Sequence, residues 1–153
     1  MGLDFGVYWR KKNAYTDSDC YDNELCYGRK SWELVYALGL SGNEPDLNRE
    51  ITIDEWMGLI EKLVPIGDYL DEIWDAFDKY ENAPEDFGDE ILTKRDKMLI
   101  ATYKKWYDAT FDVGPQLGYS FSVGYMKSFW DAKDEVIKYL EDPDYEVWAY
   151  VSY

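Results

Sequence analysis

Hydrophobic and polar residues alternate with a period of two in three stretches of the chain. Leu3, Phe5, Val7 and Trp9 alternate with more polar neighbours over residues 3–10, and residues 145–153 repeat the pattern. Residues 119–125 place Tyr, Phe, Val and Tyr at every second position, between Ser and Gly. A period of two is typical of a half-buried strand, so this pattern predicts three strands.

The hydrophobic residues between these stretches recur with helical spacing. A short helix is predicted from Ser31 to about Gly39, and Thr52 with Glu55 forms a capping box that opens a longer one. That longer pattern continues to about residue 80, and Pro65 inside it is expected to kink or restart the helix. Two more helices are predicted, one over residues 89–111 and one over 126–140.

The order of these elements predicts an α+β fold. A strand, helix and strand over residues 118–153 leave room for a right-handed crossover, which would make the last two strands parallel. The first strand is expected between them and antiparallel to both. We therefore predict a small three-stranded mixed sheet with helices, including a long helical hairpin, packed mainly on one face. Residues 1–153 are expected to form one domain, with loops at 13–28 and 41–45.

Charge and aromatic content change the functional expectation more than the fold. The net charge is −16, from 32 acidic and 16 basic residues, and 18% of the residues are aromatic. Such a field repels phosphate backbones and anionic lipids, so direct nucleic-acid and membrane binding are not expected. It attracts the basic surface of another protein. Solubility of an aromatic-rich chain, or a halophilic origin, would also explain the acidity.

The sequence lacks the residues of most catalytic and metal sites. It contains no histidine, and its two cysteines, Cys20 and Cys26, are expected to be free thiols rather than zinc ligands. Neither glycine-rich nucleotide-binding motif occurs, and the acidic loop that starts at Asp17 does not follow the calcium-loop pattern. We predict no catalytic residue, no metal and no cofactor. The N-terminal residues do not resemble a secretory leader, so a cytoplasmic location is expected.

One helical face is markedly acidic. It is formed by Asp68, Asp71, Glu72, Asp75 and Asp78, and it is expected to continue through Glu85, Asp86, Asp89 and Glu90. The first four lie within an arc of roughly 100° over about 10 Å of helix. Carboxylates held on a rigid backbone can imitate a run of phosphates. The alternatives are an ordinary solvent-facing surface, or neutralisation by Lys94, Lys97, Lys104 and Lys105 on the next helix.

Two aromatic residues of the last strand are candidates for a second binding surface. Trp148 and Tyr150 lie on the opposite phase to its apolar residues, and Tyr8 does the same on the first strand. An exposed aromatic cluster is typical of a protein-binding hot spot. The same side chains could instead pack under the loop at residues 13–28.

The opening Met1-Gly2-Leu3-Asp4, the aromatic strand after it and residues 27–32 resemble a class of small proteins of phages and their bacterial hosts. The resemblance covers about a fifth of the chain and carries no active-site residue. It implies a phage-encoded accessory protein. By analogy with DNA-mimicking anti-restriction and anti-CRISPR proteins, it favours an inhibitor of a host nucleic-acid-binding protein.

The first functional hypothesis is therefore a non-enzymatic acidic protein that binds the basic surface of a host protein through its carboxylates. The second is a phage structural or assembly protein that self-associates through exposed aromatic residues. The third is a carboxylate-based metal-binding protein or enzyme.

Overall fold

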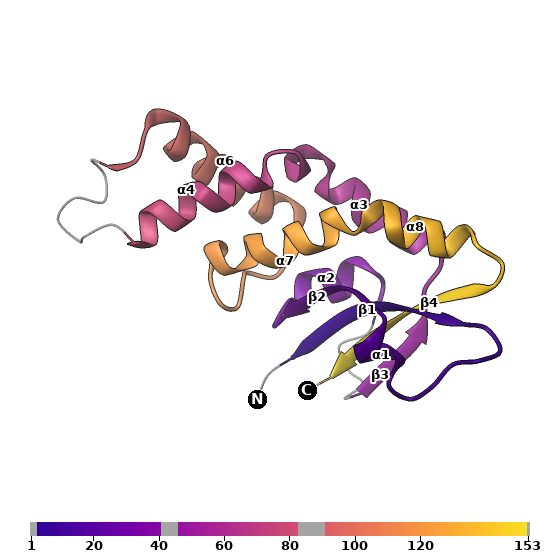
Figure 1. Ribbon diagram of the computed structural model, residues 1–153. Coiled ribbons are helices and arrows are strands. Elements are labelled where there is room, and N and C mark those ends of the chain that lie inside the picture. The colour runs from indigo at the N-terminus through magenta and orange to yellow at the C-terminus, as the bar shows by residue number, and fades with distance from the viewer. Residues whose placement is uncertain (1–2, 41–45, 83–90, 153) are drawn as a thin grey trace.

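A four-stranded antiparallel sheet lies beneath a layer of helices (Figure 1). The computed structural model describes residues 3–40, 46–82 and 91–152. The strand order is β2-β1-β4-β3. The strands are β1 (Asp4–Lys11), β2 (Glu24–Arg29), β3 (Asp46–Glu50) and β4 (Tyr145–Ser152).

The two central strands are the ones that the terminal alternation predicts. β1 and β4 pair antiparallel over eight residues, from Asp4 opposite Ser152 to Lys11 opposite Tyr145. Phe5 on β1 and Val151 on β4 are buried beneath the helices. The predicted strands at both ends of the chain, and the phase of their apolar residues, are confirmed.

The two edge strands were not predicted. Residues 13–28 were expected to be a loop, but they contain a short helix, α1 (Asp19–Asp22), and most of β2. On β2 only Cys26 and Gly28 are buried. β3 is five residues long and pairs with β4 alone. Edge strands this short and polar carry too little apolar alternation to distinguish them from a loop.

The predicted strand at residues 119–125 is wrong, and with it the parallel crossover. These residues begin α7 (Tyr119–Asp131), which α8 (Lys133–Glu141) follows after a break at Ala132. Val123, Met126 and Phe129 are buried at helical spacing, whereas Phe121, which the strand pattern put in the core, is 45% exposed. The sheet therefore has four strands rather than three and is antiparallel rather than mixed.

The helical hairpin is confirmed, with different boundaries. The helices before α7 are α2 (Trp32–Ala37), α3 (Ile53–Gly67), α4 (Leu70–Asn82) and α6 (Lys94–Thr110). The Thr52–Glu55 capping box opens α3 as predicted. A second capping box, formed by Thr93 and Asp96, opens α6 at Lys94. The start predicted for this helix, residue 89, lies outside the described residues, and α6 itself begins at Lys94.

Pro65 does not break the helix where it stands. α3 continues through Pro65 and ends at Gly67, and α4 begins at Leu70. At the break, the backbone of Gly67 lies against the indole ring of Trp130, so closely that a Cβ atom at residue 67 would overlap the ring. This contact fixes the end of α3 against α7.

The helices share one core with the sheet. α3, α7 and α8 lie over one face of it, and α4 and α6 extend as an arm beyond its edge (Figure 1). Phe5 of β1 stacks on Phe129 of α7 with ring centroids 5.4 Å apart, and Trp56 of α3 is fully buried against the same ring. The prediction that the helices pack mainly on one face is confirmed.

Both cysteines are free thiols. Cys20 lies on α1, and Cys26 is buried on β2. Burial raises the pKa of the Cys26 thiol well above its ordinary value, which keeps it protonated and unreactive near neutral pH.

Candidate functional site

The acidic face lies along α4, on the helical arm. Leu70, Ile73 and Phe77 turn into the core, as the periodicity predicts. Tyr80 was expected on the same buried face but is 55% exposed, two residues before α4 ends at Asn82. The predicted acidic residues of this helix and of the turn before it are all exposed; they are Asp68, Asp71, Glu72, Asp75 and Asp78.

Two of these five carboxylates are paired with cations. Arg95 of α6 lies 2.7 Å from Glu72, and Lys127 of α7 lies 3.2 Å from Asp71. Lys127 also contacts Asp131 at 3.1 Å, and the two carboxylates, Asp131 first, raise the pKa of its ammonium group. Because Asp71 is 80% exposed in its side chain, water screens its ion pair strongly.

The other three carboxylates have no cationic partner within the described residues. Asp78 accepts a hydrogen bond from the amide of Asn82 at 2.9 Å, which is neutral. Asp68 and Asp75 make no ion pair with a described side chain. These three residues, Asp68, Asp75 and Asp78, are called the unpaired carboxylates below.

The lysines that were candidates to neutralise the acidic face form no ion pair with it among the described residues. Across residues 3–40, 46–82 and 91–152, none of Lys94, Lys97, Lys104 and Lys105 forms an ion pair with an acidic side chain. Lys104 instead lies 5.6 Å from the ring centroid of Tyr119. The neutralising cations are Arg95 and Lys127, and they reach only part of the row.

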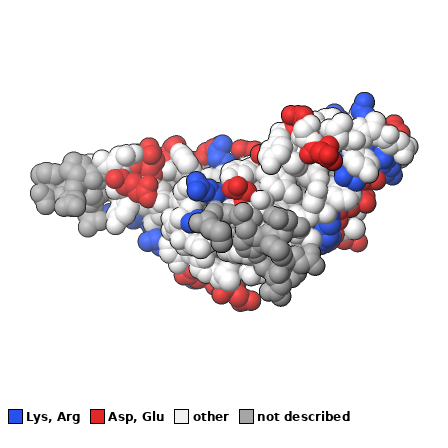
Figure 2. All heavy atoms as spheres, turned by 90° about the horizontal axis from the view of Figure 1, so that it is seen from below, with Lys and Arg blue, Asp and Glu red and all other residues white. Residues whose placement is uncertain are grey.

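The predicted continuation of the acidic face falls outside the described residues. It comprises Glu85, Asp86, Asp89 and Glu90. Figure 2 views the molecule from below, the side of Figure 1 on which the sheet lies, and acidic atoms gather on the helical arm there. Elsewhere on that side, acidic and basic atoms are interspersed.

An exposed aromatic groove lies beside this acidic face. Its main side chains are Trp74 of α4 (45% exposed), Phe121 of α7 (45%) and Tyr27 of β2 (38%). They line a hollow of about 340 Å³. Gly124 allows the close fit, because a Cβ atom there would lie 3.0 Å from the Trp74 ring. We call these three residues the aromatic groove.

Trp74 links the groove to the carboxylates. It follows Asp71 by three residues and precedes Asp78 by four, so all three project from neighbouring positions of one helical surface. A large, half-exposed indole flanked by carboxylates suits a partner that offers both an apolar contact and positive charge.

The structure does not bring Trp148 and Tyr150 into this surface. They alternate along β4 with the buried residues Val147, Ala149 and Val151, so they project from the opposite face of the sheet. Arg10 lies 3.6 Å from the ring centroid of Trp148, while the Tyr150 hydroxyl donates to Glu24 at 2.7 Å and its ring covers Gly6. Both side chains are half-buried and engaged within the fold.

The alternative that these aromatic residues pack with the loop at 13–28 has partial support. Arg10 Cζ lies 3.9 Å from the ring centroid of Tyr15, which belongs to that segment, and the same guanidinium group lies over the ring of Trp148. Tyr8, the third member of the predicted cluster, is buried and donates to Asn48 at 2.7 Å.

Sequence reasoning missed the aromatic groove for identifiable reasons. Trp74 stands among acidic residues and off the apolar stripe of α4, which was a usable signal. Phe121 was placed in the core by the false strand. Tyr27 was placed in a loop. The three residues line one hollow only because α4, α7 and β2 pack together, and the local sequence pattern does not predict that packing.

The chain matches no family model, no curated protein and no solved structure. None of the helices in the described part of the chain has the length and apolar character needed to cross a bilayer. Among the same residues, Asp, Glu and Cys side chains form no group of three or more with the geometry of a metal site.

Proposed function

We propose that this chain is a non-enzymatic binding protein that docks its helical arm on the basic surface of another protein in the cytoplasm. The observation that carries the proposal is the exposed Trp74 between the carboxylates of α4. Binding energy in protein interfaces concentrates in such aromatic residues, while surrounding charges steer the encounter. The net charge of −16 adds long-range attraction toward a basic partner.

We extend the proposal to the class of partner. Asp75 and Asp78 stand on α4, and Asp68 lies in the turn between α3 and α4, so the unpaired carboxylates follow one another along the arm. A row of this kind can occupy a groove in which Arg and Lys side chains otherwise hold phosphates. The proposed partner is therefore a nucleic-acid-binding protein, and docking would displace its nucleic acid.

A photo-crosslinking amino acid at residue 74 tests the proposal. The matched control carries it at Tyr21, which is 78% exposed on α1, away from the arm. The expected result is a partner captured in the native host from position 74 and not from position 21, with capture lost at high salt. The purified partner should then bind the protein and release nucleic acid as it does so.

Two outcomes would count against this function. Equal capture from both positions, or capture that high salt does not reduce, would contradict an acidic docking surface. Crosslinks at position 74 between two copies of the chain would instead favour the assembly alternative, in which the aromatic groove mediates self-association.

A further inference from the structure

The protein holds one of its own arginine residues between two aromatic rings. The guanidinium carbon of Arg10 lies 3.6 Å from the ring centroid of Trp148 and 3.9 Å from that of Tyr15. Its Nε atom lies 3.4 Å from Oε2 of Glu146. A flat cation between aromatic faces, with a carboxylate at its edge, is stabilised both by the rings and by the ion pair. Arg10 therefore shows which set of groups accommodates an arginine side chain in this fold.

The aromatic groove offers the same kind of ring surface to the outside. α7 lies between α4 and β2 (Figure 1), and the hollow is lined by Trp74 from α4, Phe121 from α7 and Tyr27 from β2. Trp74 and Phe121 are each 45% exposed, and no described cation lies over either ring. Much of both side chains is therefore accessible to a planar cation from a partner.

α4 and α7 run antiparallel along the groove, which places an acidic residue of α4 beside the rings. The ring of Trp74 lies against the backbone of Gly124, and Ser120 donates a hydrogen bond to Glu81. Asp78 lies between these two contacts, four residues after Trp74 and three before Glu81, and it is exposed. Residues at these spacings share one side of a helix, so the Asp78 carboxylate stands next to the Trp74 side chain.

One charged residue lines the groove itself, and it is a cation, Arg29 of β2. Asp4 of β1 is directly opposite Arg29 in the antiparallel register, and it also accepts a hydrogen bond from the Tyr27 hydroxyl at 2.7 Å. Side chains at directly opposite positions of an antiparallel pair are neighbours, so a carboxylate offsets this cation. The two charges on the β2 side of the groove therefore balance.

The α4 side of the groove has an excess of carboxylates. Lys127 is the cation there, and it is paired with both Asp71 and Asp131. Asp78 and Glu81 have no cationic partner within the described residues. A cation that enters the groove therefore meets net negative charge at the α4 wall, in addition to the field of the whole protein.

We propose that the aromatic groove receives an arginine side chain of the partner, with its guanidinium group against the rings of Trp74 and Phe121 and its edge toward the Asp78 carboxylate. This inference rests on the proposed function, which makes the partner basic. Arginine suits the groove better than lysine, because its planar group can stack on a ring and donate to a carboxylate at the same time. An arginine held in this way is no longer free to bind phosphate.

NMR titration of the isotope-labelled protein with four capped tripeptides tests the proposal. Each peptide has glycine on either side of arginine, lysine, citrulline or norleucine, and the backbone amide of Gly124, under the Trp74 ring, reports binding. The arginine peptide should bind about threefold more tightly than the lysine peptide and about tenfold more tightly than that of citrulline, its neutral analogue. The apolar norleucine peptide should bind most weakly.

Matched variants assign the preference to the groove. Trp74→Leu should give the arginine and lysine peptides equal affinity, because the ring surface is lost. Asp78→Asn should weaken binding of the arginine peptide by about fivefold, because a charge-assisted hydrogen bond is lost. Asp134→Asn on α8 makes the same change in net charge and should leave that affinity within about twofold of wild type. The spectra show at the same time whether each variant is folded.

The peptides test the groove without the partner, so the two proposals can fail separately. If arginine is preferred but no partner is captured from position 74, the docking function is wrong and the arginine site stands. If a basic partner is captured but the arginine and lysine peptides bind wild type equally, the arginine assignment is overturned and the docking function stands. Tightest binding of the norleucine peptide would also overturn it, because the groove would then take an apolar side chain. Equal weakening by Asp78→Asn and Asp134→Asn would contradict the role of Asp78.

Discussion

Arg95 of α6 donates from Nε to Oε2 of Glu72 on α4 at 2.7 Å, and this contact joins the two helices of the arm across their exposed edges. Both side chains are about half exposed, with 55% and 49% of their surface accessible. The pair orients the acidic helix without burying its charge. It contributes little to stability, because solvent-exposed ion pairs are worth about 0–1 kcal/mol.

Replacement of Arg95 should affect the stability of the fold and the binding of a basic partner differently. Arg95→Gln should lower the free energy of unfolding by no more than about 1 kcal/mol in urea titrations, because the pair is solvated. It should also tighten binding of a basic partner, since Glu72 becomes free. Lys97→Gln is the control: it changes the net charge equally, and Lys97 has no ion pair among the described residues. Identical binding by the two variants would contradict this account.

Trp74 is expected to be the main apolar contact of the proposed interface. Trp74→Ala should weaken partner binding by more than about tenfold, because truncated hot-spot residues cost 2 kcal/mol or more. Its melting temperature should change little, since the ring is 45% exposed. Tyr21→Ala, an exposed aromatic truncation on α1, should leave binding unchanged. Equal losses in the two variants would show that the groove has no special role.

The junction between α3 and α4 can be tested with two glycines of one helix. Gly67→Ala should destabilise the protein by about 1–3 kcal/mol, because the added methyl group overlaps the ring of Trp130. Gly58→Ala should stabilise it by about 0.5–1 kcal/mol, since nothing beyond the backbone of its own helix lies within 4 Å of the new Cβ and alanine favours the helix. Chemical denaturation measures both, and the same sign for both would refute the packing described at the end of α3.

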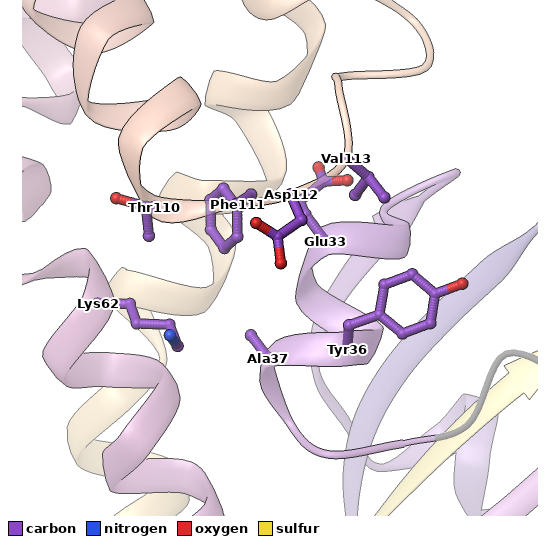
Figure 3. Close-up of a pocket in the computed structure, with 8 residues that line it drawn as sticks. All are labelled: Glu33, Tyr36, Ala37, Lys62, Thr110, Phe111, Asp112 and Val113. Carbon is purple, nitrogen blue, oxygen red and sulfur yellow. The ribbon is translucent and has the colours of Figure 1, made fainter.

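Glu33 makes stability depend on pH in a predictable direction. Because burial raises its pKa in the folded protein, the folded state holds the proton more firmly than the unfolded chain does. The free energy of unfolding that this proton contributes is fully present below the ordinary pKa of a glutamate. It is lost as the pH rises through the raised pKa of Glu33 in the folded protein. Tyr107 and Tyr125 face this carboxyl group and stay protonated near neutral pH, because burial raises the pKa of each. Lys62 and Asp112 are the other charged residues that line the cleft beside Glu33, between α2, α3 and the end of α6 (Figure 3).

The measurement compares wild type with Glu33→Gln in urea titrations from about pH 4.5 to about pH 8. The wild type should lose free energy of unfolding relative to the variant as the pH rises, by up to about 1.4 kcal/mol for each pH unit within the titrating window. Other carboxyl groups titrate in both proteins and cancel in the difference. A difference that stays constant with pH would contradict the raised pKa.

The parts of the fold that could be predicted from the sequence are those that local pattern determines. β1 and β4 are long strands with one face in the core, so their alternation is complete. The capping box of Thr52 and Glu55 depends on two residues three positions apart, and the structure contains it. The acidic and apolar faces of α4 likewise follow from helical periodicity alone.

The errors arose where a local pattern had two interpretations. Residues 119–125 alternate like a strand, but their apolar residues also fit the first turns of a helix that continues to Phe129. In that helix Ser122 is buried and its hydroxyl lies 2.5 Å from that of Tyr103. A buried polar residue satisfied by a distant tyrosine cannot be recognised from spacing.

The functional surface was predictable only in part for the same reason. The acidic row is a property of one helix. Its neutralisation by Arg95 and Lys127, and the aromatic groove beside it, depend on how α6, α7 and β2 pack around that helix. The burial of Glu33 could have been suspected from its position among the apolar residues of a short helix, but the tyrosines that act on its carboxyl group, Tyr107 and Tyr125, lie more than 70 residues away along the chain.

The most direct test of the proposed docking surface is the association rate of a double charge variant with the partner captured at residue 74. Asp75→Asn with Asp78→Asn removes two unpaired carboxylates beside Trp74. Glu135→Gln with Glu141→Gln makes the same change in net charge on α8, at the opposite end of the helical layer (Figure 1). At low salt, the α4 variant should associate about tenfold more slowly than wild type, and the α8 variant nearly as fast as wild type. Equal slowing of both variants would mean that total charge, rather than the surface of α4, governs binding.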